Sequence, residues 1–136
     1  MEASLRKLRL VQFLMLGSIG LYVLISERYG PAPRASQPIF LYLMAGLAGA
    51  CGVGALVVRY VIVKRQEAIL IGAPENKAAL RRWESAYVLV YALCEAVAVY
   101  GMVLRFTGFS FAPAVVLYMA GFLLMLFLGP QAPAAG

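Results

Sequence analysis

A single acidic residue, Glu95, stands in the middle of an apolar stretch that covers residues 85–104. As a helix rising about 1.5 Å per residue, this stretch would place Glu95 on the order of 15 Å from either end, near the midplane of a bilayer. An ionisable group there costs roughly 2.5 kcal/mol or more. We expect the protonated acid at rest, because removal from water disfavours the charged carboxylate. This placement favours reversible binding of a proton or a cation.

Tyr91 lies one helical turn before Glu95. Residues four apart share a face of a helix, so the Tyr91 hydroxyl is placed to donate a hydrogen bond to the carboxyl group. The sequence therefore predicts an ion-binding pair of Glu95 and Tyr91. The same residues also fit a second interpretation, in which a neutral Glu95 hydrogen-bonds between helices and only fixes their packing.

The composition is typical of an integral membrane protein, with 63% hydrophobic and 13% charged residues in a chain of 136. Four apolar segments each approach the roughly 20 residues that a spanning helix needs; they cover residues 8–25, 39–63, 85–104 and 109–128. We therefore predict an all-α membrane protein with four transmembrane helices, organised as a single domain over residues 1–136.

The second and third predicted spans continue beyond the apolar segments as helix-forming sequence, over residues 64–71 and 74–84. Gly72 fits the end of one helix and Pro74 the start of the next, which predicts a helical hairpin. Lys and Arg concentrate at the N-terminus and in this hairpin, namely Arg6, Lys7, Arg9, Lys64, Arg65, Lys77, Arg81 and Arg82. Since basic residues stay on the inner side, we expect a multi-pass protein of the cell membrane with both termini and the hairpin in the cytoplasm.

The second span is unusually rich in small residues, and its glycines are candidates for close helix packing: Gly46, Gly49, Gly52 and Gly54. Small residues four apart allow two helix backbones to approach each other. The partner is either another helix of the same chain or a second copy in a ring or other oligomer. Both remain open from the sequence.

Four arginines near the hairpin are candidates for binding an anionic lipid head group: Arg59, Arg65, Arg81 and Arg82. The net charge of +6 is explained by membrane topology and by attraction to anionic lipid. Outside the predicted spans no basic stripe alternates with stacking aromatic residues, so we expect no nucleic-acid partner. The chain has no histidine, no metal-ligand motif and no nucleophile–base pair, so we expect neither a cofactor or metal nor enzymatic activity.

The segment from Glu95 to Val103 resembles the region around the ion-carrying carboxylate in the proteolipid c subunits of rotary ATP synthases. A glycine-rich helix precedes it, as in that family, and the Arg-Gln-Pro-Glu loop signature is present in two halves, Arg65-Gln66 and Pro74-Glu75. The resemblance covers the second and third spans. It implies that Glu95 is the reversibly protonated site and that the glycine helix forms the inner wall of a ring.

Three functions remain open from the sequence. The first is a membrane subunit that handles protons or cations through Glu95. The second is a structural or assembly subunit of a larger membrane complex, with no ion transport. The third is a membrane protein that binds lipid head groups through its basic hairpin. Membrane lipid, further copies of the chain and other membrane subunits are the partners that these functions imply.

The orientation can be tested by cysteine-accessibility labelling. A reactive cysteine at Ser36 should be labelled by an impermeant thiol reagent from outside the cell, and one at Asn76 only after the membrane is opened, because the Lys and Arg excess keeps the hairpin inside. The reverse pattern would invert the predicted topology.

Overall fold

A computed structural model of the protein describes residues 2–34 and 37–131, so Ser36 lies outside the described residues. The described chain contains no strand, and its elements are α1 (Glu2–Tyr29), α2 (Pro38–Val57), the π-helical segment η1 (Val58–Val63), α3 (Lys64–Gly72), α4 (Lys77–Phe106) and α5 (Phe111–Phe127). The predicted all-helical fold class is confirmed.

Three helices are long and apolar enough to cross a membrane: α1, α4, and the continuous run Pro38–Gly72 formed by α2, η1 and α3. This fits a membrane protein. Helix α5 is equally apolar but has 17 residues, which gives about 25 Å against a hydrocarbon core of about 30 Å. A fourth span therefore stays a prediction.

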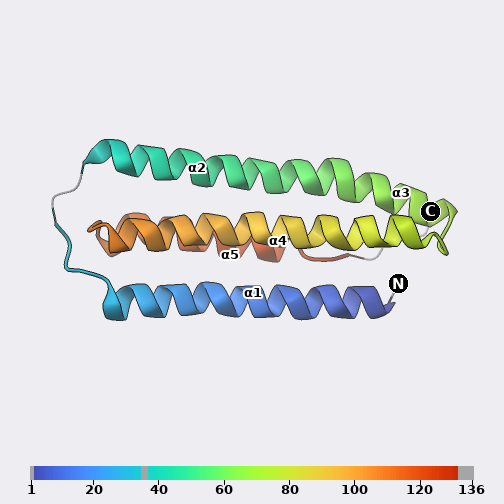
Figure 1. Cartoon of the computed structure of the whole chain (residues 1–136), viewed down its shortest axis with the longest axis horizontal. Coiled ribbons are helices and arrows are strands. Elements are labelled where there is room, and N and C mark those ends of the chain that lie inside the picture. The colour runs from blue at the N-terminus through green and yellow to red at the C-terminus, as the bar shows by residue number, and fades with distance from the viewer. Residues whose placement is uncertain (1, 35–36, 132–136) are drawn as a thin grey trace.

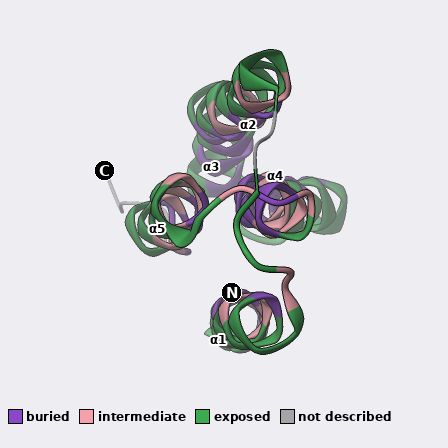
Figure 2. Ribbon diagram, turned by 90° about the vertical axis from the view of Figure 1, so that its left-hand side faces the viewer, coloured by how far each residue is buried: buried purple, intermediate pink, exposed green. Residues whose placement is uncertain are grey.

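Helix α4 is the centre of the fold. It packs against α1, α2 and α5, which lie on three sides of it when the molecule is viewed along its length (Figure 2). In Figure 1, α1 and α4 run in the same direction, with α1 and the α2–α3 run on opposite sides of α4. The three largest fully buried side chains, Trp83, Tyr87 and Tyr91, lie on α4. Helix α4 therefore contributes most of the bulk of the core.

The helical hairpin is present at one end of the molecule. Helix α3 ends at Gly72, and α4 begins at Lys77. Asn76 caps the start of α4, because its side chain accepts a hydrogen bond of 3.1 Å from the Ala79 amide. This cap satisfies an amide at the start of α4 that has no partner within the helix. The cytoplasmic location of the hairpin remains a prediction.

The close helix packing in this chain occurs at glycines other than the four predicted. A Cβ atom added at Gly121 of α5 would lie 2.7 Å from the Cys94 carbonyl oxygen, and one at Gly101 of α4 would lie 2.9 Å from the Ala114 carbonyl oxygen. These glycines let the backbones of α4 and α5 touch.

The glycines of α2 face more open space. Nothing lies within 4 Å of a Cβ atom at Gly46 or Gly49, and those at Gly52 and Gly54 would meet only leucine side chains, at 3.5 and 3.6 Å. Gly46 and Gly49 thus have no close partner among the described residues of this chain. Packing of this glycine face against another copy stays a prediction.

A pair of matched substitutions tests this assignment. Gly121→Ala should lower the free energy of unfolding in detergent by about 1–3 kcal/mol, because the new methyl group meets backbone atoms that cannot move aside. Gly49→Ala should leave the isolated chain unchanged or slightly more stable, since alanine favours a helix by up to about 1 kcal/mol. Equal losses in the two variants would contradict the α4–α5 assignment.

Candidate functional site

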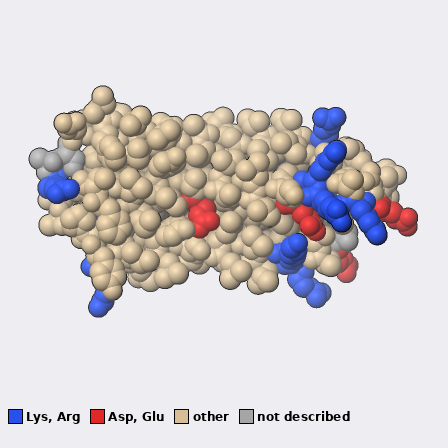
Figure 3. Space-filling view, viewed as in Figure 1, with Lys and Arg blue, Asp and Glu red and all other residues tan. Residues whose placement is uncertain are grey.

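The carboxyl group of Glu95 lies between α4 and α1. The Tyr22 hydroxyl of α1 donates a hydrogen bond of 2.7 Å to Glu95 Oε1. Both side chains are partly exposed at the outer edge of this helix pair. In Figure 3 acidic atoms are visible midway along the molecule, with uncharged residues around them. The carboxyl group is therefore held by one neutral donor and remains open towards the surroundings of the chain.

The predicted hydrogen bond between Tyr91 and Glu95 is not formed. Tyr91 is fully buried, and its hydroxyl has no hydrogen-bond partner in the part of the chain that the structure describes. Aromatic side chains on a helix lean back towards its N-terminus, and the Tyr91 ring accordingly lies 6.1 Å from the Tyr87 ring. Tyr22, and not Tyr91, donates the hydrogen bond to Glu95. The only sequence signal for Tyr22 is a phenol within the first apolar segment.

The contact between Tyr22 and Glu95 is the middle one of three polar contacts between α1 and α4, which we call the α1–α4 polar ladder. At one end, Lys7 Nζ lies 3.8 Å from Glu84 Oε2. At the other end, Arg105 Nε donates to Glu27 Oε1 at 3.0 Å, and its Nη1 donates to the Pro31 carbonyl oxygen.

The three contacts of the ladder differ in charge. Each end contact joins opposite charges, whereas no Lys or Arg among the described residues forms an ion pair with Glu95. An ionised carboxylate in an apolar setting needs a compensating charge or several donors. The middle contact therefore differs from the other two in having no opposite charge within the described residues.

A second polar group lies inside the hairpin end of the fold, and we call it the Arg59 cluster (Arg59, Glu67, Trp83 and Tyr87). Arg59 is only 6% exposed; its Nη1 lies 3.6 Å from Glu67 Oε1, and its guanidinium carbon is 5.2 Å from the centre of the Tyr87 ring. Trp83 Nε1 donates to Glu67 Oε1 at 3.5 Å. An acid and an aromatic face together compensate the buried charge.

The π-helical segment η1 brings these residues inside. A π turn holds more residues per turn than an α-helix, so it rotates the following helical face relative to the preceding one. Val63, Gln66, Glu67 and Leu70 are all buried as a result. An apolar run gives no sequence signal for such a turn, so the sequence did not predict the ion pair that buries Arg59 beside Glu67.

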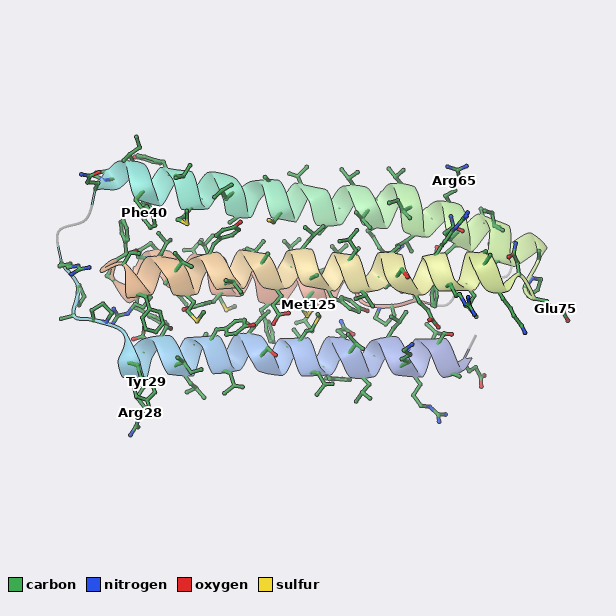
Figure 4. All side chains as sticks on the ribbon, viewed as in Figure 1. Arg28, Tyr29, Phe40, Arg65, Glu75 and Met125 are labelled. Carbon is green, nitrogen blue, oxygen red and sulfur yellow. The ribbon has the colours of Figure 1, made fainter. Side chains whose placement is uncertain are left out.

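The four arginines predicted for lipid binding are thus divided. Arg59 lies inside, whereas Arg65, Arg81 and Arg82 are exposed at the hairpin end, where Lys and Arg side chains gather in Figure 3. Figure 4 shows Arg65 pointing away from the bundle. Within residues 2–34 and 37–131, no three Cys, Asp or Glu side chains converge as ligands for a metal ion.

The Arg59 cluster predicts a large effect of removing its acid. Glu67→Gln should lower the free energy of unfolding by about 3 kcal/mol, because it leaves the Arg59 charge buried without compensation. The double variant Arg59→Met, Glu67→Gln should recover most of this loss, since it removes both charges. Equilibrium unfolding in mixed micelles measures both effects.

Glu75→Gln is the matched control, because Glu75 is exposed at the hairpin loop (Figure 4). This substitution should change stability by no more than about 0.5 kcal/mol. A double variant no more stable than Glu67→Gln alone would show that Arg59 is not the group that Glu67 compensates.

Comparison with known proteins does not assign this chain to a family. No protein-family model, no curated protein and no solved structure matches the chain.

Proposed function

We propose that this chain is a small four-span subunit of the cell membrane that binds and releases a proton, or exchanges it for a cation, at Glu95. The observation that carries the proposal is the missing counter-charge at Glu95. The other two contacts of the α1–α4 polar ladder pair opposite charges, whereas Glu95 has one phenol donor, Tyr22, at 2.7 Å.

The hydrogen bond from Tyr22 suits both states of the carboxyl group. A carboxyl oxygen accepts the phenol hydrogen whether or not the acid carries a proton. The phenol therefore holds the side chain in place while the proton enters or leaves. A lysine or arginine in the same position would keep the acid permanently ionised and prevent such exchange.

The partial exposure of Glu95 bears on how the proton reaches it. The carboxyl group opens at the edge between α1 and α4, so a neighbouring subunit or a further copy of the chain would form the rest of the access route. This supports a subunit of an assembly over a transporter that acts alone. The resemblance of the Glu95 segment to rotary ATP synthase c subunits implies the same role for the carboxyl group.

A second candidate function is a structural or assembly subunit, and the α1–α4 polar ladder favours it. Hydrogen bonds and ion pairs at three depths attach α1 to α4, and interhelical hydrogen bonds are a common means of fixing helices in a membrane. In this function Glu95 serves only as the middle contact, and its proton never leaves.

A carbodiimide that partitions into apolar sites separates the two functions, because it reacts with protonated carboxyl groups and not with carboxylates. We expect modification at Glu95, mapped by mass spectrometry, that decreases as pH rises and is absent in Glu95→Gln. The Gln variant should fold normally, because its side-chain oxygen still accepts from Tyr22. Infrared difference spectra should show a carboxyl C=O band that titrates with pH and disappears in the same variant.

Glu84 is the internal control, because it forms an ion pair with Lys7 and should not react with the reagent. Glu95→Asp should retain a titrating band, since it keeps the acid and only shortens the side chain. A carboxyl band unchanged at every pH, together with full protection of Glu95 from the reagent, would leave only the structural function.

A further inference from the structure

A groove runs along the hairpin end of the molecule between α4 and the η1–α3 segment. Its polar part, at the basic end, is lined by Gln66, Arg81, Arg82 and Ser85, and its apolar part by Ile62 and Leu89. Going from the hairpin loop towards the middle of the bundle, the lining changes from charged to apolar. A phospholipid shows the same order of polarity, from a charged head group to an apolar acyl chain.

Gln66 is the side chain in this groove that lacks a partner. It is 6% exposed, and its Oε1 accepts no hydrogen bond from any residue that the structure describes. A buried amide oxygen without a donor destabilises the folded protein, because it has lost its hydrogen bonds to water. The π-helical segment η1 places this polar side chain at the groove, and such segments are frequent at functional sites. A ligand with a hydroxyl group would satisfy the amide.

The two arginines supply a positive charge that the protein does not neutralise. Arg81 and Arg82 are exposed and form no ion pair with the described residues. The acids nearby are already occupied: Glu67 contacts Arg59 and Lys64, and Glu84 contacts Lys7. The mouth of the groove therefore favours an anion, and guanidinium groups bind phosphate oxygens well.

We propose that this groove binds one anionic glycerophospholipid whose head group carries a hydroxyl. The phosphate contacts Arg81 and Arg82, the head-group hydroxyl donates to Gln66, and an acyl chain lies against Ile62 and Leu89. A free phosphate would leave the apolar part of the groove uncovered, and a lipid without a head-group hydroxyl would leave Gln66 without a donor. The proposal does not depend on proton binding at Glu95, which lies outside this groove.

Trp83, the only tryptophan in the chain, follows Arg82 in sequence and reports on this site. In vesicles of neutral phosphatidylcholine, brominated phosphatidylglycerol should quench Trp83 fluorescence at lower mole fraction than brominated phosphatidylcholine. Arg81→Gln and Arg82→Gln should each weaken this preference about tenfold, the loss of one charge-assisted hydrogen bond to the phosphate. Native mass spectrometry should count one retained phosphatidylglycerol per chain.

Arg65→Gln is the matched control, because it removes the same charge from the same end of the molecule at a side chain that points away from the bundle (Figure 4). It should leave the preference unchanged. An equal loss in Arg65→Gln, or no preference in the unaltered protein, would reduce the effect to general surface attraction and overturn the site.

Gln66→Leu tests the hydroxyl contact. The unaltered protein should prefer phosphatidylglycerol to phosphatidylmethanol, which has the same charge and no head-group hydroxyl, and this preference should disappear in the variant. The variant should also fold, because leucine fills a similar volume without a polar group. Equal binding of the two lipids by the unaltered protein would show that Gln66 does not select the head group.

Discussion

The hydrogen-bonded and ionic contacts between α1 and α4 hold together a pair of helices that apolar packing alone would leave weakly joined. Between helices in a membrane, lipid tails compete with leucine side chains on equal terms, so burial of apolar surface drives little association. The hydrogen bond between Tyr22 and Glu95 adds to this association, because within the hydrocarbon a separated polar side chain finds few other partners. The position of α1, and hence the environment of Glu95, depends on these contacts.

Helix α5 joins α4 by a different means. Gly101 and Gly121 bring the two backbones into contact, and the buried hydroxyls of Tyr118 and Ser26 add a hydrogen bond of 2.7 Å between α5 and α1. Close backbone approach provides van der Waals contact that lipid cannot match. One face of α4 is thus covered tightly by α5 while the face that carries Glu95 is covered only by α1, and this asymmetry leaves the carboxyl group accessible.

The sequence predicts the helices well because apolar runs and Gly and Pro breaks are local signals. These signals predict the apolar runs around α1, α2 and α4 and the isolated position of Glu95. They also predict the hairpin, in which α3 ends at Gly72. Which residue meets Glu95 is not local, since it depends on how far α1 is rotated and shifted relative to α4. Arg59 was expected to bind head groups, but it lies within the π-helical segment and is buried beside Glu67. The glycine content of α2 likewise predicted that its backbone packs closely against another helix. The close contact between helix backbones instead occurs at single glycines of α4 and α5.

The polar groups that remain incompletely satisfied indicate where a partner is needed. Buried polar atoms in folded proteins nearly always have a hydrogen-bond partner, so each exception requires an explanation. Arg59 is compensated within its cluster by Glu67 and the Tyr87 ring. Gln66 has no such neighbour and lines a groove, and Glu95 has one neutral donor and is partly exposed. These are the two positions at which we propose that a lipid and an exchangeable proton or cation bind.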